Sequence, residues 1–276
     1  MKQNLGLIDR NTWSPLGRLL QEAFRDGFDQ DIIIGGALTN TQQGVYAQSI
    51  GQNYLLGSWR INKDGRQFIY SQAGASPLTL GHMGQGEAPT SNWYEQVQTG
   101  HGWSASAKSG IVLITTGSPP AVNEWKDGWL TVTAGATGKG QCHQIAGNTS
   151  HDTTPTVDLG EGIVTAIPDT ADITIVKSIY KDIIVVATGG LTARPAGVPL
   201  ITVTAAYFYW AQIKGPAPLM IDTGEAVTVG DPVGHPAACA VAGACGVIVT
   251  LKGGYGTVLD GHTADEYAIV DLNLGR

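Results

Sequence analysis

Charged residues are scarce in this chain, and their scarcity helps to exclude intrinsic disorder. Lys and Arg number 16 and Asp and Glu 23 among 276 residues, so 14% of the chain is charged and the net charge is −7. Globular proteins average about 25% charged residues. Disordered chains combine high charge with low hydrophobicity, whereas 42% of this chain is apolar. The 38 glycines follow no three-residue period, which excludes a collagen helix and favours a fold with short strands and many turns.

Basic clusters and long apolar runs are also lacking. Only Lys126 and Lys139 fall between Lys108 and Lys177, so we expect no direct binding to nucleic acid, which requires clustered cations. No apolar run approaches the roughly 20 residues of a membrane-spanning helix, so we expect no membrane partner. Residues 1–8 lack the apolar core and cleavage site of a signal peptide, which favours synthesis in the cytoplasm.

Cysteine is too rare for a disulfide framework, since the chain has only Cys142, Cys239 and Cys245. We expect free thiols, and the sequence leaves open whether Cys239 and Cys245 pair. His235 precedes these two cysteines and His262 follows them. The six-residue spacing of the cysteines in a run of small apolar residues does not match the paired ligands of a zinc site. We therefore expect small core residues here, with no metal and no cofactor.

Signatures of catalysis are absent as well. The run Gly135-Ala-Thr-Gly-Lys-Gly140 lacks the spacing of a phosphate-binding loop and has glycine where Ser or Thr would bind magnesium. No Gly-x-Ser-x-Gly or His-Glu-x-x-His motif occurs. The prediction is that the chain is not an enzyme. Paired carboxylates of a glycoside hydrolase are recognised only by their separation in space, so a polysaccharide-degrading enzyme stays an alternative.

One helix is predicted near the start of the chain. Ser14-Pro15 supplies an N-cap and a proline at the first helical position. Apolar residues then follow at helical spacing before Gly27, namely Leu16, Leu19, Leu20, Ala23 and Phe24. So short an amphipathic helix needs a partner surface, either in its own domain or on a neighbouring subunit.

Most of the remaining chain predicts short β-strands. Residues 54–61 and 67–70 flank Lys63-Asp64-Gly65, a hairpin-turn sequence. From residue 105 on, short β-branched runs at close spacing are typical of a sandwich or barrel. Gly189-Gly190 looks like a boundary. The fold class is mainly β: an N-terminal arm and extended region over residues 1–104, with one short amphipathic helix, then β-sandwich or β-barrel modules over 105–188 and 189–276.

Two of the predicted strands have distinctive patterns. The closing strand, residues 267–274, alternates, with Ala268, Val270, Leu272 and Leu274 on one face and Asp271 and Asn273 on the other. Residues 207–210, Tyr-Phe-Tyr-Trp, place aromatic side chains on both faces of one strand. Such a strand is either central to a sandwich or covered by another subunit.

Two stretches carry a resemblance to a known class of proteins. The first is Asn123-Glu-Trp-Lys-Asp-Gly-Trp-Leu-Thr-Val-Thr-Ala-Gly-Ala-Thr-Gly-Lys-Gly-Gln141, and the second is Ala205-Ala-Tyr-Phe-Tyr-Trp-Ala-Gln-Ile-Lys-Gly-Pro-Ala217, with Gly224, Gly230-Asp-Pro-Val233 and Glu266-Tyr-Ala-Ile-Val-Asp-Leu272. Together they resemble capsid-associated structural proteins of tailed bacteriophages, particularly of marine phages. The resemblance covers residues 105–274.

The resemblance implies a decoration or cement protein on the outer surface of the virion head. Its partners would be the major capsid protein and further copies of itself, as a homotrimer or other homo-oligomer. Contact residues would be Leu16, Leu19, Leu20 and Phe24 in the arm and Tyr207, Tyr209 and Trp210 in the last module, because aromatic residues dominate interface energies. The alternative is a tail, neck or head-fibre component that binds a host glycan through Trp93, Tyr94 and Trp103.

Overall fold

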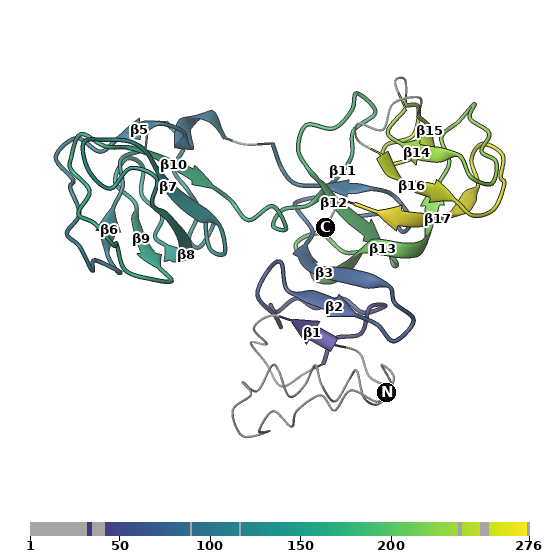
Figure 1. Cartoon of the computed structure of the whole chain (residues 1–276), viewed down its shortest axis with the longest axis horizontal. Helices are drawn as coiled ribbons and strands as arrows, with labels where there is room; N and C mark the ends of the chain where they lie inside the picture. The colour runs from purple at the N-terminus through teal and green to yellow at the C-terminus, as the bar shows by residue number, and fades with distance from the viewer. Residues whose placement is uncertain are drawn as a thin grey trace, which may run out of the picture.

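The fold is almost entirely β-sheet (Figure 1). The computed structural model describes residues 42–88, 90–115, 117–236, 239–248 and 254–274, and the backbone of residues 32–34. Within these ranges no α-helix occurs, and the one helical element is the 3-10 turn η2, Ser91–Trp93. The mainly β fold class with two β modules is confirmed. The helix predicted at residues 14–26 lies outside the described residues.

The larger sheet joins segments from both ends of the chain. Its main order is β1-β2-β3-β13-β17-β16-β14-β15, and β12, β4 and β11 branch from β13. The strands are β1 (Ile32–Ile34), β2 (Trp59–Ile61), β3 (Gln67–Gln72), β4 (Gly84–Gln85), β11 (Ile184–Val185), β12 (Pro195–Pro199), β13 (Phe208–Met220), β14 (Pro232–Gly234), β15 (Gly246–Val247), β16 (Gly254–Val258) and β17 (Tyr267–Asn273). We call residues 42–88 and 178–274 the discontinuous module.

The predicted hairpin at Lys63-Asp64-Gly65 is confirmed, since β2 and β3 pair antiparallel around it. Gly65 has a φ of +84°, a backbone conformation that glycine adopts without steric cost. The Arg66 side chain donates to Asp64 Oδ2 at 2.7 Å within the turn. This charge pair is satisfied within the hairpin tip itself.

The smaller sheet is formed wholly by residues 90–177, which we call the inserted module. Its order is β5-β10-β7-β8-β9-β6. The strands are β5 (Gln96–Val97), β6 (Ile111–Val112), β7 (Trp129–Ala134), β8 (Cys142–Asn148), β9 (Thr156–Leu159) and β10 (Asp172–Val176). Both sheets curl, so that each resembles half of a barrel (Figure 1).

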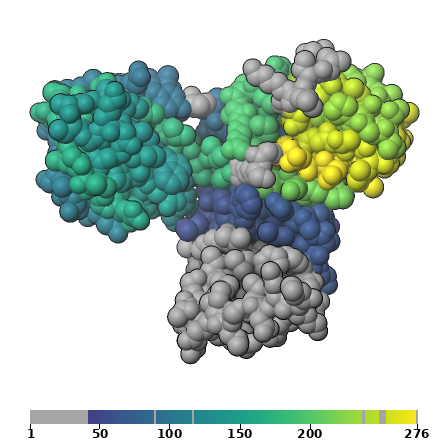
Figure 2. All heavy atoms as spheres, viewed as in Figure 1, coloured from purple at the N-terminus to yellow at the C-terminus, as the bar shows by residue number. Residues whose placement is uncertain are grey.

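Each module has a hydrophobic core of its own. One cluster, which includes Trp93, Trp103 and Trp125, draws all its buried members from the inserted module. Three further clusters draw theirs from the discontinuous module. Separate cores are what defines separate domains. In the space-filling view the two modules form distinct lobes with a narrow waist between them (Figure 2).

The sheet pairings group the chain differently from the predicted boundaries at 104/105 and 188/189. β2 and β3 precede the inserted module in sequence but pair with β13, which follows it. β5 precedes residue 105 and pairs with β10. The chain therefore leaves the discontinuous module at residues 88–90 and returns at residues 177–178. Strand pairing between distant segments has no local sequence signal, because register depends on tertiary packing.

Candidate functional site

The predicted arm contacts cannot be placed, whereas the predicted aromatic contacts can. Leu16, Leu19, Leu20 and Phe24 lie outside the described residues. Tyr207 is half-buried and packs against a core cluster of the discontinuous module. Tyr209 is 1% exposed and Trp210 is fully buried.

Trp210 belongs to an aromatic cluster inside the discontinuous module. Its ring centroid lies 5.0 Å from that of Tyr70 and 5.1 Å from that of Tyr54, and its indole N–H donates to the Gln43 carbonyl at 3.0 Å. Such aromatic pairs add stabilisation beyond the buried area itself. Of the two explanations that the sequence left open, a central strand is the one observed. Tyr209 and Trp210 are core residues of this chain rather than surface contacts.

An exposed apolar surface instead lies on the outer face of β17. The predicted alternation of this strand is confirmed, with Ala268, Val270 and Leu272 buried. The opposite face presents Tyr267 and Ile269, which are 41% and 47% exposed.

Neighbouring strands extend this apolar surface. Met220 and Pro218 on β13 are the cross-strand partners of Tyr267 and Ile269. Leu259, which is 47% exposed, donates its backbone N–H to Ile269. We call these five residues the β17 face. Its aromatic and aliphatic side chains were not predicted, because the sequence pattern drew attention to Asp271 and Asn273 on this side.

A cluster of charges connects the two modules at the waist. Lys177 Nζ lies 2.6 Å from Glu87 Oε2, 2.9 Å from Asp182 Oδ2 and 3.1 Å from Glu124 Oε1. Burial lowers the pKa of Lys177, but the hydrogen bonds to these carboxylates outweigh it, so the pKa lies above its ordinary value. Glu87 and Asp182 belong to one module and Lys177 and Glu124 to the other. We call these four residues the Lys177 cluster.

Two further contacts join the modules beside the Lys177 cluster. Lys181 Nζ donates to the backbone carbonyls of Asn123 and Glu124 at 2.6 and 3.1 Å. Gln52 Nε2 donates to Asp127 Oδ2 at 3.0 Å. Burial lowers the pKa of Lys181. These bonds cross the module boundary, as the Lys177 cluster does, and link the two modules directly.

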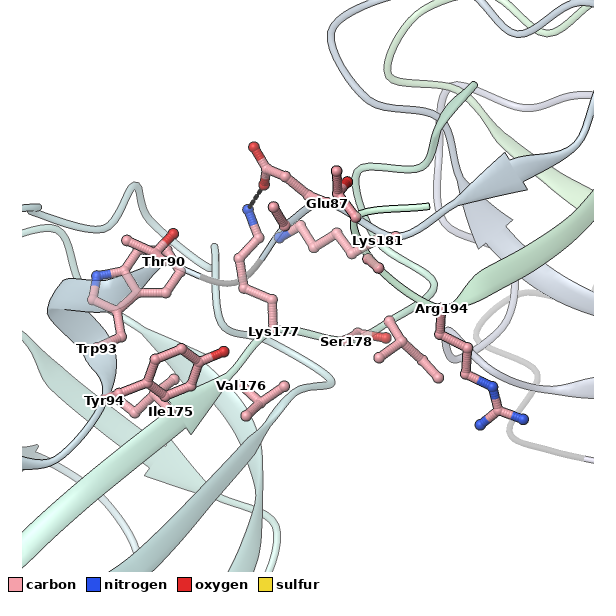
Figure 3. A pocket seen from close by; sticks show the side chains of 15 residues that line it. Glu87, Thr90, Trp93, Tyr94, Ile175, Val176, Lys177, Ser178, Lys181 and Arg194 are labelled. Carbon is pink, nitrogen blue, oxygen red and sulfur yellow. Dashed lines mark hydrogen bonds and ion pairs between the residues drawn. The ribbon is translucent and has the colours of Figure 1, made fainter. Parts of the chain in front are cut away.

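A cleft with a volume of about 170 Å³ opens beside the Lys177 cluster, between the modules (Figure 3). Tyr94 and Val176 lie on one side of it and Arg194 on the other. Its lining comprises Gly86, Glu87, Ala88, Thr90, Trp93, Tyr94, Ile175, Val176, Lys177, Ser178, Ile179, Lys181, Thr192, Ala193 and Arg194. Clefts with apolar walls and a few polar groups, at domain junctions, are typical places for ligands.

The aromatic cluster proposed for the glycan-binding alternative is divided by the fold. Trp93 and Trp103 are 5% and 6% exposed and belong to the core of the inserted module. Trp93 and Tyr94 both line the cleft, Tyr94 as a half-buried residue, whereas Trp103 does not line it. Burial raises the pKa of Tyr94 above its ordinary value. The three aromatic residues therefore do not form one exposed groove.

The cysteines and histidines form no cation site within the part of the chain that the structure describes. Cys245 is buried, Cys239 is half-buried and Cys142 is exposed, each as a free thiol. Burial raises the pKa of Cys245 to about 12 and that of Cys239 to about 11. The thiolate is the metal ligand and the nucleophile, so at neutral pH neither side chain suits either role.

Comparison with known protein families, curated proteins and solved structures finds no match to this chain. Within the described ranges, no helix is long and apolar enough to cross a membrane. The surfaces that remain as candidates for function are the β17 face, the cleft and the junction between the modules.

Proposed function

We propose that this chain is a structural protein of a tailed-bacteriophage virion, which decorates and stabilises the outer surface of the head by binding the major capsid protein. The observation that carries the proposal is the β17 face, where apolar side chains stand exposed on a sheet whose other face is fully packed. Contiguous exposed apolar residues are typical of protein–protein contacts.

The arrangement of the modules also supports this proposal. A cement protein acts by touching neighbouring capsid subunits at once, and two modules linked by the Lys177 cluster suit such bridging. A specific contact buries more than about 1,000 Å², and repeated contacts on a symmetric shell add avidity. The net charge of −7 favours the outer surface over the DNA-filled interior.

The resemblance of residues 105–274 to capsid-associated proteins supports the choice of partner. It also supports a homo-oligomer, a homotrimer above all. The predicted arm would supply a second contact through Leu16, Leu19, Leu20 and Phe24. The chain would then act as a binding protein with no catalytic role.

The test is co-sedimentation of the purified chain with heads assembled without it. We expect Ile269→Asp to weaken binding at least about tenfold, because a charge would be buried in an apolar contact. Leu20→Ser with Phe24→Ser tests the arm separately. The matched control is Val229→Asp, at a turn residue that is 69% exposed and lies outside the β17 face.

Failure of the unchanged chain to bind heads would overturn the proposed function. Binding that Ile269→Asp leaves intact would remove the β17 face from it, and binding that the arm variant leaves intact would remove the arm. Unchanged urea denaturation of each variant shows that the modules remain folded.

A further inference from the structure

Trp129 is the one tryptophan with an exposed side chain within the described part of the chain. It is 47% exposed and begins β7, on the outer face of the inserted module. Its cross-strand partners are Val176 on β10 and Gln144 on β8. An exposed indole ring offers a large, flat apolar area on which a ligand of matching chemistry can pack.

Val176 links Trp129 to the cleft. It is 37% exposed, it pairs with Trp129, and it lines the cleft together with Tyr94 and Ile179. Ile179 is itself 36% exposed. An apolar strip therefore runs from Trp129 through Val176 to the junction between the modules.

Unused polar groups accompany this strip. The Gln144 side-chain amide, the Tyr94 hydroxyl and the Arg194 guanidinium have no hydrogen-bond partner within the described residues. Gln144 and Arg194 are exposed. Lys177 is neutralised by three carboxylates, whereas Arg194, in the cleft wall, has no acidic partner among the described residues.

We propose that Trp129 and the adjoining cleft bind an oligosaccharide that carries a carboxylate. A sugar ring has an apolar C–H face that can pack on an indole, and hydroxyl groups around its edge that pair with amide and hydroxyl groups. A carboxylate on the sugar would pair with the Arg194 guanidinium, whose planar donor geometry matches it.

This chemistry favours a saccharide over a peptide. An added peptide strand is bound chiefly through backbone hydrogen bonds along a sheet edge. The unused groups here are side-chain amide, hydroxyl and guanidinium groups, spread around aromatic and aliphatic surfaces. The inference is independent of capsid decoration, because it concerns a different surface from the β17 face.

The experiment measures binding of the full chain to acidic polysaccharides (alginate, polygalacturonate and hyaluronate) and to neutral ones (dextran and amylose). We expect binding to at least one acidic polysaccharide and weaker binding to the neutral ones. Trp129→Ala should weaken it about tenfold, while Trp129→Phe retains most of it, because stacking needs an aromatic face. Arg194→Gln should abolish the preference for acidic sugars.

Matched controls are Tyr46→Ala, which removes an aromatic residue that is 63% exposed on the other module, and Lys139→Gln, which removes an exposed cation from the inserted module. Both should bind as the unchanged chain does. The proposal is overturned if no polysaccharide in the panel binds, if Trp129→Ala and Arg194→Gln bind normally, or if an alternating Glu-Leu peptide binds more tightly than every saccharide.

Discussion

Two tryptophans show how position decides the role of a residue. Trp129 and Trp210 both lie in β-strands, and both belong to the sequence stretches that resemble capsid-associated proteins. Trp210 is fully buried beneath Tyr54 and Tyr70, whereas Trp129 is 47% exposed. Trp210 thus contributes to stability, while Trp129 is available for binding. The difference comes from the neighbouring strands, since the residue type is the same.

A pH-dependent contact is predicted at His262. Its ring nitrogens lie 2.9 Å from Asp260 Oδ2 and 3.2 Å from Glu266 Oε2. Hydrogen bonds to Asp260 and Glu266 raise the pKa of His262 above 6.5. The stabilisation is therefore complete below pH 6.5, as long as both carboxylates stay ionised, and it fades as the pH rises through the folded-state value. At still lower pH the stabilisation is lost again, because Asp260 and Glu266, whose pKa values are lowered, become protonated.

An NMR titration of the His262 ring checks this. Asp260→Asn should lower its pKa, while Glu161→Gln, on the other module, should leave it unchanged. A His262 pKa at or below 6.5 in the unchanged chain would contradict the prediction.

At the scale of elements, glycine permits the close approach of β16 to β17. A Cβ added to Gly256 would overlap the backbone oxygen of Asp271 on the neighbouring strand. Gly256 pairs with Leu272 on β17 and with Val233 on β14, so it occupies a central position in the sheet. A side chain here would force the strands apart.

We expect Gly256→Ala to lower the free energy of unfolding by about 1–3 kcal/mol, the usual range for overpacking. Gly189→Ala is the control, because a Cβ there meets no atom within 4 Å. Urea denaturation measures both. Equal stability of the two variants would show that the strands relax around the added methyl group.

Two prolines of β13 limit the pairing of this strand with further strands. Pro216 and Pro218 pair with Asp271 and Ile269 of β17, and neither has an N–H to donate. Prolines in a strand discourage pairing with a further strand on their free side. This stretch of β13 is therefore poorly suited to accept a further strand, whereas the β17 face offers side chains for binding.

At the scale of the whole molecule, the Lys177 cluster links the two modules through ion pairs. We expect Lys177→Met to leave both cores folded but to widen the range of module orientations, because Glu87, Glu124 and Asp182 would then repel one another. The loss of stability should be about 1–3 kcal/mol, between the values for an exposed and a buried ion pair, since solvent screens the partly exposed carboxylates.

Small-angle X-ray scattering and urea denaturation test this prediction. Lys126→Met, which removes a half-buried lysine of the inserted module from outside the cluster, is the control. A scattering profile of Lys177→Met identical to that of the unchanged chain would mean that Lys181 and Gln52 hold the modules without the cluster.

The sequence by itself determined the fold class, the hairpin at Lys63-Asp64-Gly65 and the alternation of β17. These depend on local causes, namely turn chemistry and the two-residue period of a strand. They are properties of neighbouring residues, so they can be predicted without knowing the rest of the chain.

Only the tertiary structure decided that the inserted module interrupts the discontinuous one, that Trp93, Trp103, Tyr209 and Trp210 are buried, and that Trp129 is exposed. Low charge and abundant glycine are compatible with many strand pairings. The choice among them depends on contacts between residues far apart in the chain, such as Trp210 with Gln43 and Lys177 with Glu87. Those contacts form only when distant parts of the chain pack together, and the contact of Lys177 with Glu87 lies at the cleft between the modules.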